Sequence, residues 1–166
     1  FVSIQLARQL YYAFIFPRIK YGIESYGTYS NSNIQKLQTI QNKLIKLLLW
    51  RNRLTPTDTV HKDINILKVS HIHKLYTALF VRDCIHRDTI DMYWDYFQTR
   101  VNIHAHDTGT RHQLHTPRHN KAIGRTSVKA QGCTIWNNIR PEIKSNKTRN
   151  GFKRQLFKYY ISFYHI

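Results

Sequence analysis

The spacing of apolar residues constrains this chain more than any other feature of its sequence. Between residues 34 and 48 the apolar positions recur at intervals of three and four, which places them on one face of an α-helix, while Lys36 and Lys43 fall on the other face. Three further stretches share this spacing, so we predict a mostly α-helical fold. The four apolar sets are Ile4, Leu6, Ala7, Leu10, Tyr11, Phe14 and Ile15; Ile34, Leu37, Ile40, Leu44, Leu47 and Leu48; Ile72, Leu75, Tyr76, Leu79, Phe80 and Cys84; and Phe152, Leu156, Tyr160 and Phe163.

Residues typical of helix ends lie beside these stretches. Pro17 is expected to end or kink the first helix, and Thr55 followed by Pro56 predicts a short helix that ends near Asp63. The third stretch is expected to continue into the aromatic residues at 92–97, and Gly132 to interrupt the helical stretch after residue 126. The residues predicted to cap helices are Ser3, Thr55, Ser70, Thr126, Ser127 and Thr148.

The composition changes between Gln98 and Arg125, where five His and four Arg stand among Asn, Asp, Thr and Gly. A loop of this length is usually functional or disordered. We predict a long irregular basic loop, with room for one short β-hairpin around residues 113–116. It divides the chain into a helical segment (1–97), the loop (98–125) and a C-terminal helical segment (126–166). The predicted fold is a small, mostly α-helical assembly.

The charge indicates the kind of partner. Twenty-six Lys and Arg against nine Asp and Glu give a formal net charge of +17, spread from Arg8 to Lys158. Such an excess favours a polyanion, and nucleic acid is the first candidate. An anionic membrane is the rival, but the apolar runs fall short of the roughly 20 residues that a spanning helix needs. We therefore expect RNA and DNA as partners, and no membrane.

Aromatic residues make up 13% of the chain, which is too many for a disordered basic tail. Trp50 and Trp136 are expected to fill the core, whereas Trp94 is assigned neither to the core nor to the surface. Cys84 and Cys133 form no CxxC pair, which argues against a disulfide framework or a thiolate zinc site. A reducing, intracellular setting is therefore expected.

Four segments, in order, resemble the region downstream of the polymerase core in reverse transcriptases of non-LTR (LINE-type, jockey-like) retrotransposons. They are LYYAFIFPRIKYGIESYG (10–27), IQKLQTIQNKLIKLL (34–48), NILKVSHIHKLYTALF (65–80) and the tail from His104 to Ile161. The tail resembles the family in its Thr-Pro-Arg step, its Ile-Trp-Asn and its closing Phe-Lys-Arg helix. Cys133 and Arg140 depart from the pattern, because the family usually has Pro there.

The resemblance implies the C-terminal, non-catalytic end of an RNA-directed DNA polymerase from a transposable element, and a chain that begins with Phe1 is expected to be a fragment. It also implies the upstream polymerase domain of the same polyprotein as a partner, and a location in cytoplasmic ribonucleoprotein and the nucleus. The family holds its catalytic Mg²⁺ ions on an Asp-Asp turn of the polymerase core, and no Asp-Asp pair occurs here. We expect no cofactor and no activity in this chain alone.

The acidic residues stand singly along the sequence. Asp88, Asp91 and Asp95 could share one helix face. They lie beside aromatic residues, and we expect them to balance Arg82 and Arg87 rather than to hold a metal ion.

Two other kinds of site have partial support. A zinc site is one interpretation of the His-rich stretch with Cys133, but no second thiolate lies near, so we prefer a solvated or phosphate-contacting loop. A nuclease is suggested by Asp107 with Glu142-Ile143-Lys144, although Glu142 after Pro141 equally suits the start of a helix, which we prefer. The histidines concerned are His104, His106, His112, His115 and His119.

Basic residues in two places are the candidates for nucleic-acid contact. Those of the loop stand beside His and Thr side chains, and those of the last helix lie away from its apolar stripe, with Lys153 nearest to it. The candidates are Arg111, Arg118, Arg125, Lys129, Arg149, Lys153, Arg154 and Lys158. The preferred function is support of RNA or primer-template binding through non-specific phosphate contacts. The competing one is a structural segment that completes the fold of the parent polymerase and whose charge balances an acidic surface there.

Overall fold

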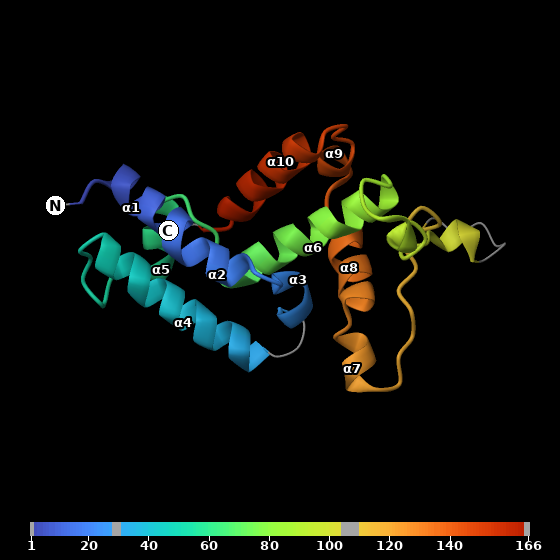
Figure 1. The fold of residues 1–166 in the computed structure, drawn as a ribbon, viewed down its shortest axis with the longest axis horizontal. Coiled ribbons are helices and arrows are strands. Elements are labelled where there is room, and N and C mark those ends of the chain that lie inside the picture. Colours follow the sequence, from blue (N-terminus) through green and yellow to red (C-terminus); the bar gives the residue numbers. More distant parts are fainter. Residues whose placement is uncertain (1, 28–30, 104–109, 165–166) are drawn as a thin grey trace.

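The computed structural model describes residues 2–27, 31–103 and 110–164, and the regular elements within them are all helical (Figure 1). The prediction of a mostly α-helical fold is confirmed. The α-helices are α1 (Ile4–Leu10), α2 (Phe16–Lys20), α3 (Ile23–Tyr26), α4 (Asn31–Leu48), α5 (Thr57–Asp63), α6 (Val69–Ile85), α7 (Ala122–Arg125), α8 (Val128–Asn137), α9 (Pro141–Lys144) and α10 (Arg149–Ile161). A π-helix, η1 (Tyr11–Ile15), and two 3-10 helices, η2 (Asp91–Tyr93) and η3 (Arg100–Asn102), complete the set.

Helix α6 is the centre of the molecule, and α2, α3, α4, α8 and α10 all pack against it (Figure 1). It is buried on most of its circumference, including the polar side chains of His73, Thr77 and Arg82. Two predictions about this helix are wrong. Its cap is the extended backbone of Lys68, with Ser70 inside the first turn, and the helix ends at Ile85 instead of continuing through residues 92–97.

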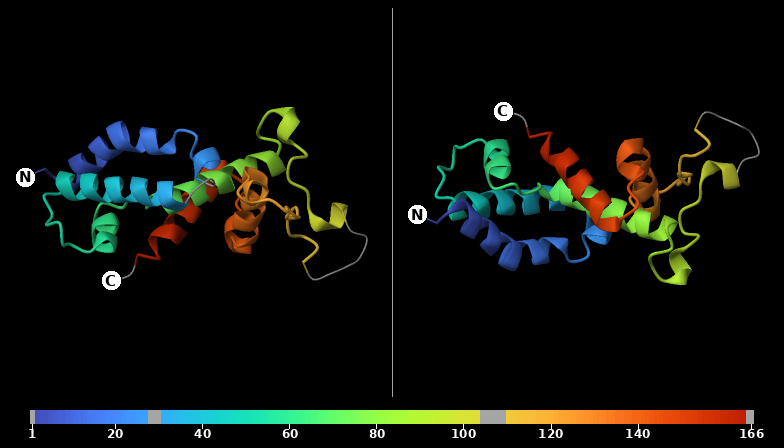
Figure 2. Two further views of the ribbon diagram at one scale, coloured as in Figure 1. Left: turned by 90° about the horizontal axis from the view of Figure 1, so that it is seen from below. Right: turned by 90° about the horizontal axis from the view of Figure 1, so that it is seen from above.

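The N-terminal helices form one continuous rod alongside α4 (Figure 2). The Oγ atom of Ser3 accepts a hydrogen bond from the amide of Leu6 at 3.2 Å, which confirms the predicted cap. The rod does not end at Pro17, which lies in the first turn of α2 and follows a turn whose hydrogen bonding is no longer α-helical. The π-helical turn η1 precedes it, and the rod ends before Gly22, which has a φ of 64°.

The predicted apolar face of α4 is only partly covered. Ile34 is buried, and so is Ile45, which was not among the residues predicted for this face. Gln41 lies between them and donates hydrogen bonds to the Tyr11 hydroxyl (2.7 Å) and the Leu67 carbonyl (2.9 Å). Ile40 and Leu47 are 54% and 68% exposed. Trp50, in the turn after α4, is 73% exposed, so the prediction that it fills the core is wrong; the same prediction for Trp136, 9% exposed, is confirmed.

The described part of the predicted loop (98–125) is mostly irregular, as predicted, although it holds the short 3-10 helix η3 and ends in the short helix α7. In the described part of this loop one isolated antiparallel bridge joins Thr99 to Leu114, so a short pairing stands where we predicted a hairpin. Short helix α5 ends at Asp63 as predicted, but it begins at Thr57, two residues after the expected cap Thr55.

The C-terminal helices pack back onto α6. Ser127 and Thr148 cap α8 and α10 with their side chains, as predicted. Gly132 does not interrupt α8, because it lies inside the helix and is buried against Phe97 and Val81. The main core cluster contains residues from Ile19 to Tyr164 and so draws on both helical segments of the chain.

Candidate nucleic-acid interface

A groove of about 530 Å³ lies between the N-terminal rod and α10, and we call it the α1–α10 groove. Its walls combine cations, aromatic rings and side-chain amides. The lining residues are Arg8, Tyr12, Asn65, Asn150, Lys153, Arg154, Phe157, Lys158, Ile161 and Ser162. Four of these ten are Lys or Arg and none is acidic, so the groove offers an anion several donors without a competing carboxylate.

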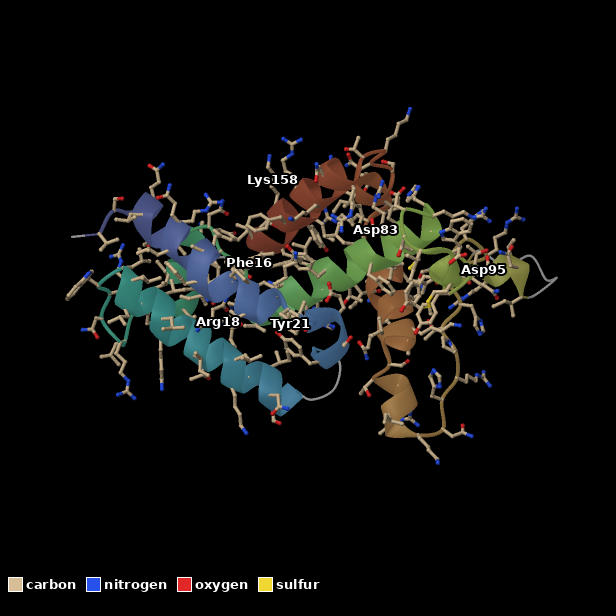
Figure 3. All side chains as sticks on the ribbon, viewed as in Figure 1. Phe16, Arg18, Tyr21, Asp83, Asp95 and Lys158 are labelled. Carbon is tan, nitrogen blue, oxygen red and sulfur yellow. The ribbon has the colours of Figure 1, made fainter. Side chains whose placement is uncertain are left out.

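The α10 wall follows from the helical spacing of its sequence. Phe152, Leu156 and Tyr160 are buried on one side, while Arg154 and Lys158 are exposed, as predicted. Phe163 was placed on the same stripe, but it is 50% exposed and Tyr164 is buried instead, because α10 ends at Ile161. Figure 3 shows Lys158 projecting from α10.

The opposite wall consists of Arg8 and Tyr12, which lie one helical turn apart. The guanidinium of Arg8 stands over the Tyr12 ring, 5.7 Å from its centroid. The Tyr12 ring is held edge-on by Phe16 at 5.1 Å between centroids. Burial raises the pKa of the Tyr12 hydroxyl, although Arg8 opposes this, so the phenol is neutral near pH 7.

Lys153 lines the groove with an ammonium group that is partly withdrawn from water. Its Nζ atom lies 5.6 Å from the centroid of the Tyr76 ring, and Nζ of Lys20 lies 5.0 Å from the same centroid. Burial lowers the pKa of Lys153, and the charges of Lys20 and Arg149 lower it further. A bound anion would relieve both effects, because it replaces lost hydration and offsets the repulsion.

Below the groove lies an apolar recess of about 220 Å³. Tyr12, Lys153 and Phe157 line both spaces, so the recess continues the groove toward the core. Its other lining residues are Tyr11, Phe16, Ile66, Leu67, Ile72, Leu75 and Tyr76. The site therefore has a basic rim and an apolar floor.

The other four candidates belong to the loop, α7 and α8, and α7 and α8 lie on the opposite side of α6 from α10 in the view of Figure 1. Arg111, Arg118 and Arg125 are exposed, and the Nε of Arg125 donates to the carbonyl of His119 at 3.2 Å. The Nζ of Lys129 stands over the Tyr96 ring, 5.1 Å from its centroid. The structure therefore divides the eight candidates between two surfaces.

Arg149 is the member of the α10 set that does not line the groove. Its Nε donates to both carboxylate oxygens of Asp83 at 3.0 and 2.9 Å, which ties the start of α10 to α6. Asp83 (labelled in Figure 3) also approaches the buried guanidinium of Arg82 at 3.5 Å. Arg149 thus has a structural partner, whereas Lys153, Arg154 and Lys158 face the groove.

The acidic residues after α6 make different contacts. Asp88 forms an ion pair with Arg82 at 2.9 Å, as predicted, while the guanidinium of Arg87 lies over the Trp94 ring. The Oδ1 atom of Asp91 accepts a hydrogen bond from the amide of Met92 at 2.8 Å. Within the described residues no three His, Cys, Asp or Glu side chains come together as they would around a metal ion.

The residues of the two weighed alternatives are only partly described. His104, His106 and Asp107 lie outside the described residues. Cys133 is buried, its thiol donates to the carbonyl of His115 at 3.1 Å, and burial raises its pKa to about 11. Glu142 lies in the first turn of α9 after Pro141, as the helix-start interpretation predicted.

Sequence reasoning missed Arg8, Tyr12, Asn65 and Phe157 as parts of one site. The spacing of Arg8 and Tyr12 by four was a visible sign that they share a helix face. No local pattern, however, indicates that this face stands opposite α10. That juxtaposition depends on contacts between the two ends of the chain.

Comparison with known proteins adds no assignment: no protein-family model, curated protein or solved structure matches the chain. Across the described residues no helix combines the length and apolar character needed to cross a membrane.

Proposed function

We propose that this chain is a nucleic-acid-binding helical segment, the C-terminal, non-catalytic portion of a retrotransposon RNA-directed DNA polymerase. Its role is to hold RNA or primer-template nucleic acid by phosphate contacts. The family assignment rests on the ordered resemblance of four sequence segments. The binding role rests on the molecule itself and can be tested separately.

One observation carries the binding role: Arg8, Lys153, Arg154 and Lys158 line one groove, and none of the described residues that line it is acidic. Exposed basic residues on a solvated helix are usually dispersed or paired with carboxylates. Here two distant segments contribute cations to the same concave surface, and Lys153 is partly buried, with the charge of Lys20 lowering its pKa. Such a surface favours a phosphate backbone over a single small anion, because it offers several separated donors.

Salt-dependent binding tests this role. We expect a fluorescein-labelled 12-nucleotide strand to bind in an anisotropy titration, with an affinity that falls steeply as salt rises. The double variant Arg154→Glu/Lys158→Glu should bind more weakly and with a smaller salt slope. The slope should fall by about 0.7 for each phosphate of a single strand that the variant no longer neutralises.

The matched control is Lys36→Glu/Lys43→Glu, which makes the same change in net charge on the exposed face of α4. It should weaken binding less. Equal losses of affinity in the two double variants would show that net charge alone attracts the strand, and absent or salt-independent binding would contradict the proposed function outright.

A second candidate function, completion of a larger fold, is favoured by a different surface. Between the N-terminal rod and α4 lies a shallow cavity of about 210 Å³, whose lining includes Phe14, Ile40 and Leu44, and Phe14 and Ile40 are largely exposed. Arg18 lines the same cavity (Figure 3). An apolar patch with a basic rim suits the upstream polymerase domain of the same polyprotein, if that domain presents apolar and acidic side chains.

A further inference from the structure

We infer that the α1–α10 groove takes an unpaired nucleotide, with the phosphate on its basic rim and the base against Tyr12 and Phe157. This inference rests on the proposed function and narrows it from nucleic acid in general to single-stranded RNA or DNA. The juxtaposition of a basic rim and an aromatic, apolar floor carries it.

The rim supplies what a phosphate needs. Arg154 and Lys158 are exposed on α10, and Arg8 faces them from the N-terminal rod. A backbone that passes between these elements would meet cations on both sides. Either a duplex or a single strand could satisfy this part of the site, because both present phosphates.

The floor of the groove distinguishes a single strand from a duplex. Tyr12 and Phe157 are half-buried rings that line both the groove and the apolar recess below it. In a duplex the bases are stacked inside the helix, so only sugars and phosphates would reach this floor. An unpaired base can turn toward it, and stacking on an aromatic side chain contributes about 1 to 3 kcal/mol per base.

The side chains around the two rings suit a base. The guanidinium of Arg8 stands over the Tyr12 ring, 5.7 Å from its centroid, so a cation and a ring lie together where a nucleotide would place its phosphate and its base. Asn65 and Asn150 place two amide groups at the groove, each with both donors and acceptors for a base edge or a ribose. Asn65 has a φ of 54°, a left-handed conformation that asparagine tolerates better than most residues.

The experiment compares dT12 alone with dT12 paired to dA12, and adds U12 as the RNA counterpart of the single strand. Fluorescein-labelled dT12, U12, and dT12 paired with dA12 are titrated with the chain at one low salt concentration. The variants are Phe157→Leu and Tyr12→Leu/Phe157→Leu, which keep apolar bulk and remove the rings. Tyr159→Leu is the control, because Tyr159 is also half-buried on α10 but is not among the residues that line the groove.

We expect the double variant to bind dT12 and U12 about tenfold more weakly, or weaker still, while duplex binding stays within twofold. Tyr159→Leu should leave all three affinities within twofold. Circular dichroism checks that each variant is helical. If the double variant is not folded, the single variant Phe157→Leu is the test, and it should bind the single strands threefold more weakly, or weaker still.

Equal weakening of single-strand and duplex binding, or unchanged single-strand binding in the folded ring variants, would overturn this inference. The proposed function would survive either result, because Arg154→Glu/Lys158→Glu would still weaken binding of both forms. Failure of the wild-type chain to bind any of the three probes would overturn the proposed function and this inference together.

Discussion

At the scale of single residues, His73 shows the effect of burial on a titratable side chain. The side chain is 8% exposed, it packs against Gly27, and its Nε2 makes no hydrogen bond within the part of the chain that the structure describes. Burial lowers its pKa to about 4, helped by the charge of Lys74. Burial likewise lowers the pKa values of His61 and His71 to about 4.

Acid should therefore destabilise the protein before its carboxylates titrate. In the unfolded chain these histidines bind protons below about pH 6.5, whereas in the folded chain they do so only near pH 4. The free energy of unfolding should therefore decrease as the pH is lowered from about 6.5 to 4. Above pH 6.5 the histidines should contribute no pH dependence. Urea unfolding followed by Trp fluorescence from pH 7.5 to 4.5 measures the decline.

The variant His73→Met tests the assignment of this decline. Removal of one of the three histidines should make the dependence on pH shallower over that window. A slope identical to that of the wild type would mean that His73 is protonated alike in both states.

At the scale of the elements, the packing of α8 on α6 depends on one glycine. A Cβ atom at Gly132 would lie 2.9 Å from two carbons of the Phe97 ring and 3.0 Å from Cγ2 of Val81. The helix propensity of glycine is poor, yet the missing side chain lets the two helices approach. Sequence pattern alone suggested a helix break here, because propensity is local and this approach is not.

Gly132→Ala should therefore destabilise the fold by about 1 to 3 kcal/mol, although alanine is the better helix former. Thermal unfolding followed by circular dichroism measures this change. Thr134→Ala, at an exposed position of the same helix, should shift stability by no more than about 0.5 kcal/mol. A stabilised Gly132→Ala variant would show that propensity outweighs the close contact.

At the scale of the whole molecule, the α1–α10 groove and the exposed apolar surface are formed by different residues. The α1–α10 groove gathers cations, while the rod and α4 leave Phe14, Ile40 and Leu47 largely exposed. Apolar patches of this kind usually mark contact surfaces or promote association. The two candidate functions therefore use separate surfaces and need not exclude each other.

The variant Ile40→Gln/Leu47→Gln should reduce self-association of the isolated chain without loss of helix content, because both side chains are already in water for most of their surface. Sedimentation velocity over a range of protein concentrations detects the change. Ile123→Gln, which alters an equally exposed residue on α7, should have little effect. Unchanged concentration dependence in the double variant would argue against a contact role for this face.

The sequence by itself determined the features that depend on near neighbours. Apolar residues three and four apart predicted α4, α6 and α10, and Ser3, Ser127 and Thr148 were recognisable caps because capping joins residues within one turn. The same spacing placed Arg154 and Lys158 away from the core. Composition established the excess of positive charge.

Only the tertiary structure determined which residues far apart in the sequence contact each other. It brought Arg8 and Tyr12 opposite α10, enclosed α6 on most of its circumference, and left Trp50 and Leu47 exposed where their apolar character indicated the core. These outcomes depend on which helix faces find a partner, and each such contact joins residues far apart in the sequence. Periodicity fixes the direction of a side chain on its own helix, but the packing of all the helices determines what that side chain faces.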